Sequence, residues 1–400
     1  MPGLAVGTIV AKNFLSFARV LASSLRQHHP EVPFFVVLAD QADGAFDAAL
    51  EPFEVIPLES LGIPNVRRLC FWYPRLELSV VAKPYLLGCL LDRGYASAVF
   101  LDADILILGA LDRLFQATTT HSVALTPHLA DHLSCSDRVA RELNILQSGV
   151  YNGGFVGVSS TTAGQQFLAW WKARLRKHCR HNLAEGMHYD QRWLDLVPSL
   201  FDDVYVERDA AYNVAYWNLP ERDTDAGARF FHFSGFDPTT PEMVTRYSHR
   251  LTMDTVGRSA ALFDRYVRLL EREGHGVTMH WPYSFDRFDN GVPIPAFVRE
   301  LYRELDEEAA AAFGDPFCTQ GERSYYRWLN EPVRADQTDR AVTRLWDAVY
   351  RRRPDLQVAF PDHLVADSVA FLDWTVTYGL REHQIPDAFA PPRWRAARIE

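Results

Sequence analysis

Apolar residues in the first 240 positions alternate between short continuous runs and stretches with helical spacing. Short runs are typical of strands buried on both faces, and apolar positions three and four residues apart are typical of helices. Strands are predicted at Leu4–Val10, Pro33–Asp40, Phe53–Leu58, Val99–Leu108, His121–Thr126, Gly154–Val158 and Arg229–Gly235. Helices are predicted at Phe14–Gln27, Pro84–Leu91 and Thr161–Cys179. This alternation predicts an α/β domain with a mostly parallel sheet and helices on both faces.

The pattern changes after about residue 240, where strands become hard to find. Amphipathic spacing predicts helices at Arg258–Glu273, Pro295–Phe313 and Gln337–Arg352, separated by aromatic-rich loops. We therefore expect two domains, an α/β domain over residues 1–245 and a mainly helical extension over residues 246–400.

Composition narrows the class of protein. The chain has 400 residues, of which 48% are apolar, so it can bury a substantial core. Its formal net charge of -10 argues against a general polyanion binder. The five cysteines lack CxxC spacing, which indicates thiols rather than a disulfide framework. With no signal peptide or membrane-spanning run, we expect a cytoplasmic protein, and contact with a membrane surface stays open.

Two carboxylates interrupt the apolar run V-F-L-D-A-D-I-L-I-L, at Asp102 and Asp104. Residues i and i+2 of a strand point to one face, so both carboxylates can enter one cleft at the end of the strand. Two such charges repel unless a cation lies between them, and Mg²⁺ or Mn²⁺ prefers carboxylate and phosphate oxygens. The alternative is a turn with both groups solvated.

Six motifs occur in a fixed order along the chain. They are A-K-P-Y-L-L (82–87), G-Y-A-S-A-V-F-L-D-A-D-I-L-I-L (94–108), Y-N-G-G-F-V-G-V (151–158), H-Y-D-Q-R-W-L (188–194), Y-N (212–213) and F-H-F-S-G (231–235). This order resembles the GT-A nucleotide-sugar glycosyltransferases, and within them the retaining family of glycogenin and the bacterial lipopolysaccharide galactosyltransferases. The resemblance covers residues 4–240. It implies a GT-A fold, a UDP-sugar donor, Mn²⁺ or Mg²⁺, and transfer of a hexose with retention of configuration.

The resemblance also implies a role for individual residues. The metal ligands would be Asp102, Asp104 and His232, and the catalytic pair would be Asp190 and Gln191. Glutamine is a poor nucleophile, which favours displacement on the same face of the sugar. The donor would contact Ile9, Val10, Ala11, Asn13, Asp40, Lys83, Asn152, Gly153 and Gly235.

Each assignment has a purely structural alternative. His232 can be a core histidine hydrogen-bonded within an aromatic strand, and Lys83 an ordinary surface lysine. Y-N-G-G can be a simple β-turn, and Asp190 can cap a helix that begins at Gln191.

Aromatic residues mixed with amides and carboxylates mark the extension, in W-P-Y-S-F-D-R-F-D-N-G-V-P-I (281–294) and Y-Y-R-W-L-N-E-P (325–332). Such stretches look like parts of bacterial polysaccharide glycosyltransferases and suit a saccharide or glycolipid acceptor. Trp281, Tyr283 and Trp328 are the acceptor-binding candidates, and packing on the catalytic core is the alternative. The K-H-C-R-H cluster (177–181) fits no closed zinc site.

Two other functions compete with sugar transfer. A sugar-nucleotide nucleotidyltransferase would need a glycine-rich basic loop after the first strand, where this chain has A-K-N-F-L-S-F-A-R. A non-catalytic carbohydrate-binding or scaffold protein derived from such an enzyme would not need Asp102, Asp104, His232 and Asp190 together.

Overall fold

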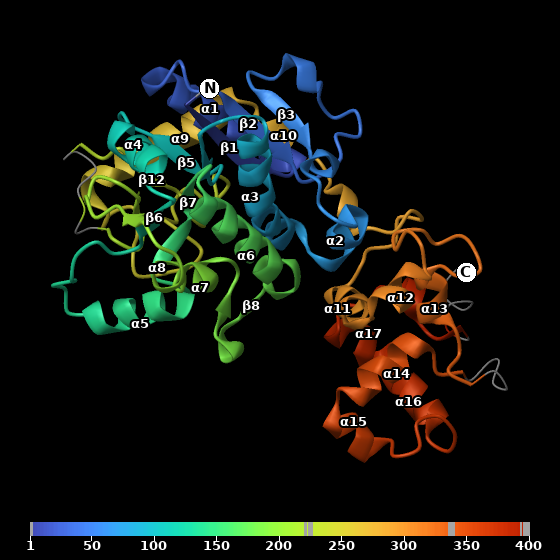
Figure 1. Cartoon of the computed structure of the whole chain (residues 1–400). Coiled ribbons are helices and arrows are strands. Elements are labelled where there is room, and N and C mark those ends of the chain that lie inside the picture. The colour runs from blue at the N-terminus through green and yellow to red at the C-terminus, as the bar shows by residue number, and fades with distance from the viewer. Residues whose placement is uncertain (1–2, 220–221, 223–226, 335–340, 393, 395–400) are drawn as a thin grey trace. The chain divides into compact units, whose positions relative to one another are not determined.

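The computed structural model describes residues 3–219, 222, 227–334, 341–392 and 394. These residues form two compact units, which we describe separately (Figure 1). Unit 1 comprises residues 1–64 and 75–283, and unit 2 comprises residues 65–74 and 284–400.

A seven-stranded sheet forms the centre of unit 1, with the order β10-β6-β7-β4-β1-β2-β3. Its strands are β1 (Leu4–Val10), β2 (Phe34–Leu38), β3 (Glu54–Pro57), β4 (Ser97–Leu101), β6 (Val123–Pro127), β7 (Tyr151–Ser159) and β10 (Val204–Val206). β7 runs antiparallel to both of its neighbours, and the other pairs are parallel. The predicted mostly parallel α/β sheet is therefore confirmed.

Helices cover both faces of this sheet. α3 (Arg75–Asp92) packs on β1 and β4 and against α6 (Thr162–His178), and Leu86 of α3 fills the space beside Gly7. On the opposite face, α1 (Leu15–His28) and α4 (Asp112–Thr120) bury an apolar cluster that includes Val6 and Val99. The sheet is thus shielded from water on both sides, as a mostly parallel sheet requires.

A second, three-stranded sheet begins where β4 ends. It consists of β11 (Val214–Ala215), β12 (Phe230–His232) and β5 (Ile105–Ile107), and β12 runs antiparallel to β5. The prediction of one strand over Val99–Leu108 is therefore wrong. The run breaks at a turn closed by the Ile105 amide, which donates to the Asp102 carbonyl at 3.2 Å. Both carboxylates lie in this turn, where they avoid the dry interior of the sheet.

Two further predicted elements differ in the structure. Pro84 lies inside α3, which begins nine residues earlier at Arg75 instead of at the proline. The predicted helix Pro295–Phe313 is two helices, α11 (Ala296–Glu304) and α12 (Glu307–Ala311), separated where Asp306 caps α12 by accepting a hydrogen bond from the Ala309 amide. Residues 337–340 of the predicted helix Gln337–Arg352 lie outside the described residues.

Unit 1 also contains helices and two short strands outside the two sheets described above. They are α5 (Arg138–Ser148), β8 (His181–Asn182), β9 (Met187–His188), α7 (Gln191–Leu194), α8 (Val197–Leu200), α9 (Ala260–Arg272) and α10 (His275–Thr278). α9 packs on α1, and its Tyr266 ring stacks on Phe233, which directly follows β12, with centroids 3.7 Å apart. Residues 246–283, assigned above to the extension, therefore pack within unit 1, and the compact units divide at residue 283 rather than 245.

Unit 2 is helical, as predicted for the extension. It contains α2 (Val66–Trp72), α11, α12, α13 (Tyr325–Asn330), α14 (Arg344–Arg351), α15 (Pro354–Ala359), α16 (Ser368–Trp374) and α17 (Leu380–Glu382). α2 comes from the N-terminal part of the chain, and its Phe71 contacts the rings of Phe288, Tyr302, Phe317 and Tyr325. An aromatic core therefore joins two segments that are more than 200 residues apart in sequence.

Two further predictions concern single features of the chain. The five cysteines, all in the described part of the chain, form no disulfide. Among the described residues we find no helix with the length and apolar character needed to cross a bilayer.

Candidate metal centre and its surroundings

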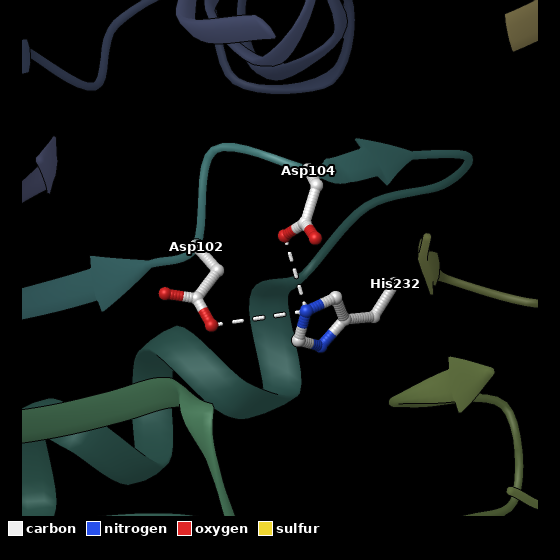
Figure 2. Close-up of side chains that lie close together, drawn as sticks. All are labelled: Asp102, Asp104 and His232. Carbon is white, nitrogen blue, oxygen red and sulfur yellow. Dashed lines mark ion pairs between the residues drawn. The ribbon is translucent and has the colours of Figure 1, made fainter. Parts of the chain in front are cut away.

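A turn at the end of β4 and the pairing of β5 with β12 bring three potential metal ligands together. Asp102 directly follows β4, and its amide donates to the Gly154 carbonyl of β7 at 2.9 Å. Asp104 directly precedes β5, and its carbonyl accepts from the Phe233 amide at 2.9 Å. Because Ile105 of β5 pairs with His232 of β12, the imidazole lies beside both carboxylates (Figure 2).

The three side chains face one another across short distances. His232 Nε2 lies 3.1 Å from Asp104 Oδ1 and 3.7 Å from Asp102 Oδ2, and the three ligand atoms all lie within 4.8 Å of one another. The carboxylates are partly exposed, at 31% and 27%, while His232 is buried. The group is thus open to solvent on the carboxylate side, where a further ligand can bind.

Hydrogen bonds around Asn152 fix the orientation of His232. Asn152 Oδ1 accepts from the Gly154 amide at 3.1 Å and lies 3.1 Å from His232 Nδ1. Asn152 Nδ2 lies 3.3 Å from His128 Nε2, and burial lowers the pKa of His128 to about 3, so that this ring is neutral and can accept. The contact at Nδ1 leaves Nε2 as the ring nitrogen that faces the two carboxylates. Such outer hydrogen bonds orient metal-binding histidines in proteins.

The charges in this group are unevenly distributed. Burial raises the pKa of Asp102, and Lys83 and His232 only partly oppose the rise. Burial also disfavours the ionised form of Asp104, but the adjacent His232 outweighs it and lowers the pKa of Asp104. Burial opposes a charge on His232, yet Asp104 and Asp102 raise its pKa. Two carboxylates that share a site repel each other, and a nearby positive charge favours their ionised forms.

Lys83 lies beside this group from α3. Its ammonium is buried, lies 3.0 Å from Asp190 Oδ2 and 3.4 Å from Asp102 Oδ1, and donates to the Gly153 carbonyl at 2.9 Å. Burial opposes its charge, but the two aspartates raise the pKa of Lys83. The surface-lysine alternative is therefore wrong. The buried Lys83 ammonium thus offsets part of the negative charge of Asp102 and Asp190.

The Y-N-G-G motif lies within strand β7, so the β-turn alternative is also wrong. Its glycines make space for the site. A Cβ added at Gly153 would lie 2.5 Å from Asp190 Oδ2, and one at Gly154 would lie 2.5 Å from His232 Cε1. Glycine is therefore required at both positions for close approach of the side chains opposite, rather than for an unusual backbone conformation.

Asp190 and Gln191 lie next to this strand at the start of α7. The Asp190 side chain forms no cap hydrogen bond with the helix and is bound to Lys83 instead. Gln191 Oε1 accepts from Asn152 Nδ2 at 3.0 Å and from the Gly153 amide at 3.2 Å, and its Nε2 donates to the Ser148 carbonyl at 3.0 Å. Both side chains thus belong to the hydrogen-bond network of the candidate metal ligands.

The other donor-binding candidates lie at the ends of β1 and β2. Ile9, Val10 and Ala11 are buried, and the Val10 carbonyl accepts from the Ala39 amide at 2.8 Å. β1 pairs in register with β4, which places these residues at the same sheet edge as Asp102. Asp40 is buried and accepts from the Lys12 amide at 3.2 Å.

Two donor-binding candidates have distinct local features. The buried Oδ1 of Asn13 has no hydrogen-bond partner among the described residues, so it is suited to accept from a ligand. Gly235 follows β12 with a φ of 72°, a conformation that favours glycine.

The acceptor-binding candidates belong to different units. Trp281 and Tyr283 lie in unit 1, where the Trp281 ring stacks on Phe46 with centroids 6.0 Å apart. Trp328 lies in unit 2 and stacks on Tyr325 at 5.7 Å. Packing is therefore observed around both tryptophans, and acceptor binding stays a prediction.

Three residues near the site were missed by the sequence analysis. His128 orients Asn152, as described above. The Arg246 amide donates to the Gly235 carbonyl at 2.9 Å, and Arg246 Nη2 donates to the Tyr247 hydroxyl at 3.0 Å. That hydroxyl, and to a smaller extent Asp104, raise the pKa of Arg246. These residues occur in no recognisable motif, and only the fold brings them near the candidate metal ligands.

Comparison with known proteins places the chain in no established family, because no family model matches it. It is 23% identical over 246 residues to the uncharacterised protein YfnF of Bacillus subtilis strain 168, covering 57% of this chain and 80% of YfnF. It is 24% identical over 259 residues to the uncharacterised protein YfnD of the same organism, covering 58% of this chain and 78% of YfnD.

Solved structures of glycosyltransferases are also similar to this chain. A structure of galactosyltransferase LgtC in complex with donor and acceptor sugar analogues is 18% identical, with a TM-score of 0.40, and the match covers 66% of this chain and 95% of LgtC. The glycosyltransferase GlyE of Streptococcus pneumoniae TIGR4 is 13% identical, with a TM-score of 0.43, and the match covers 72% of this chain and 67% of GlyE.

Proposed function

We propose that this chain is a divalent-metal-dependent glycosyltransferase of the GT-A type. The observation that carries the proposal is the convergence of Asp102, Asp104 and His232 at the edge of a mostly parallel sheet. Ligands of such sheets bind beyond the carboxyl ends of the strands. The donor would be a nucleotide sugar, with a UDP-sugar favoured by the resemblance of the motifs, and the acceptor a saccharide or glycolipid.

The ligand set fits Mn²⁺ or Mg²⁺. Both ions favour carboxylate oxygens, and Mg²⁺ usually keeps several waters beside its protein ligands. When bound, such an ion neutralises charge on the diphosphate leaving group. Asp102, Asp104 and His232 would hold it, with Asn152 keeping the His232 Nδ1 proton turned away from it.

The surrounding residues would bind and orient the donor. Asn13, Asp40 and residues 9–11 would contact the nucleoside at the ends of β1 and β2, and Gly235 would allow the phosphates to approach the backbone. The Lys83 ammonium would hold the Asp190 side chain in place for the hydroxyls of the sugar. Asn152 and Gly153 would line the same side of the sugar site.

We further propose retention of configuration through displacement on one face of the sugar. Gln191 is a poor nucleophile whose amide is held by three hydrogen bonds, and Asp190 is bound in an ion pair with Lys83. Neither side chain is prepared for covalent attack. The departing phosphate would then accept the proton of the acceptor hydroxyl.

A screen of nucleotide sugars tests the proposal. We expect one of them to be hydrolysed or transferred only when Mn²⁺ or Mg²⁺ is present, and UDP to bind more tightly with Mn²⁺ in isothermal titration. Product NMR should show the anomeric configuration of the donor. Absence of nucleotide binding with and without metal would overturn the proposal in favour of a scaffold protein.

A further inference from the structure

Helix α5 turns an apolar face toward solvent. Val139, Leu143 and Leu146 occupy positions i, i+4 and i+7, so they share one side of the helix, and each is more than half exposed. The other side is attached to the unit through the buried Arg141, whose Nη2 donates to the Trp217 carbonyl at 2.8 Å. The apolar face is therefore presented outward by a helix that is fixed in place.

The β8–β9 hairpin extends this surface. Arg192 joins the two elements, because its Nη1 donates to the Leu146 carbonyl at 2.8 Å and its Nε donates to the Gly186 carbonyl of the hairpin at 3.3 Å. The exposed Leu183 lies in the same hairpin. Figure 1 shows α5 and the hairpin projecting along one side of unit 1. We call these four apolar side chains, Val139, Leu143, Leu146 and Leu183, the apolar ridge.

The charge of this region is opposite to that of the whole chain. Residues 131–200 contain eight arginines and lysines against six aspartates and glutamates, whereas the formal net charge of the chain is -10. The last turns of α6, which lead into the hairpin, carry the exposed Arg174 and Lys177. Apolar side chains flanked by arginine and lysine are typical of surfaces that lie on anionic lipid.

We propose that the apolar ridge and its flanking basic residues dock on an anionic lipid bilayer. The apolar side chains would enter the boundary between headgroups and acyl chains, and Arg174 and Lys177 would contact lipid phosphates. A stable protein partner needs about 800 Å² of well-packed surface on each side, whereas the apolar ridge consists of four separate exposed side chains. Shallow insertion into lipid needs only a few such side chains together with charge attraction.

Vesicle flotation tests this docking with the full chain and no donor or metal. Vesicles of phosphatidylcholine alone are compared with vesicles that contain 30% phosphatidylglycerol. We expect the chain to float with the anionic vesicles only. The variant Val139→Ser/Leu143→Ser/Leu146→Ser should reduce the bound fraction at least about tenfold, because it removes most of the inserted apolar area. Arg174→Gln/Lys177→Gln should reduce binding less, and the loss should shrink in high salt.

A control variant shows whether the loss of flotation is specific to the apolar ridge or follows from any loss of exposed apolar side chains. Leu50→Ser/Val358→Ser/Val365→Ser removes three exposed apolar side chains elsewhere and should float like the wild type. Circular dichroism checks that both triple variants fold. Absence of flotation by the wild type, or equal flotation by the apolar-ridge variant, would overturn the proposal. A wild-type dimer in light scattering that the apolar-ridge variant loses would assign this face to a second copy of the chain. Because the test contains no nucleotide sugar, its failure leaves the proposed transferase activity untouched.

Discussion

Replacement of Gly154 by alanine tests whether close packing against His232 holds this ring in position for the proposed metal. An ideal Cβ at residue 154 lies 2.5 Å from His232 Cε1 and 2.7 Å from both His232 Nδ1 and Asn152 Oδ1. Ordinary van der Waals contact begins near 3.4 Å, so the ring has to retreat by about 0.9 Å. The neighbouring rings oppose this retreat, since Trp217 packs edge-on against His232 with centroids 5.3 Å apart.

Such a shift is large compared with the tolerance of a metal–nitrogen bond, which is a few tenths of an ångström. We expect Gly154→Ala to weaken Mn²⁺ binding about 10- to 100-fold, as disturbed outer hydrogen bonds do at other metal centres. Overpacking should also lower the free energy of unfolding by about 1–3 kcal/mol. Isothermal titration with Mn²⁺ measures the first effect, and thermal unfolding of the metal-free protein measures the second.

Gly157→Ala is the matched control on the same strand. Its added Cβ would meet Thr118 of α4, on the face of the sheet away from α3, so the stability loss should be similar while Mn²⁺ binding stays near the wild-type value. If Gly154→Ala is folded and binds Mn²⁺ within twofold of the wild type, the metal centre described here does not depend on His232. Equal losses of affinity in both variants would attribute the effect to general destabilisation.

Other variants test the remaining parts of the site. Asp104→Asn should abolish metal-dependent turnover and leave the unfolding temperature nearly unchanged, whereas the exposed Asp254→Asn should retain activity; full activity of Asp104→Asn would refute its role as a ligand. Gln191→Ala should lower kcat much more than it weakens UDP binding, measured against Gln165→Ala on the surface of α6, and an equal loss of both would place Gln191 in donor binding instead. Buried His128 has a pKa of about 3 against about 6.5 when unfolded, so the unfolded chain binds the extra proton, and stability should fall by about 1.4 kcal/mol for each pH unit below 6.5. Denaturant titrations between pH 7 and pH 4 should therefore show a shallower loss for His128→Gln than for the wild type, and identical slopes would contradict the low pKa.

Continuous apolar runs predicted the main strands well, because these strands are buried on both faces and are apolar along most of their length. β1, β2 and β6 lie within one or two residues of the predicted runs, since buried strands between helices have little freedom in their composition. The same rule failed at residues 99–108. A continuous apolar run cannot reveal that the chain turns between Asp102 and Asp104 and passes into a second sheet, because both β4 and β5 are buried.

Only the resemblance of the motifs to a known family predicted that Asp102, Asp104 and His232 lie together. No local pattern connects His232 to Asp104, which lies 128 positions earlier, and the antiparallel pairing of β12 with β5 brings them together. His128 and Arg246 were missed for the same reason. Burial of Lys83 was also invisible in sequence, because its partners Asp102 and Asp190 come from separate elements.

Because α2 packs in unit 2 although it comes from the N-terminal part of the chain, unit 2 cannot be removed by a single cut without disturbing α2. A chain cut after residue 283 would still contain Phe71, but without the four aromatic rings that surround it. During synthesis Phe71 leaves the ribosome before Tyr325, so its ring stays exposed until the C-terminal part of the chain has been made. A fragment of residues 1–283 is therefore expected to be prone to aggregation when produced alone, even though it contains every proposed metal ligand.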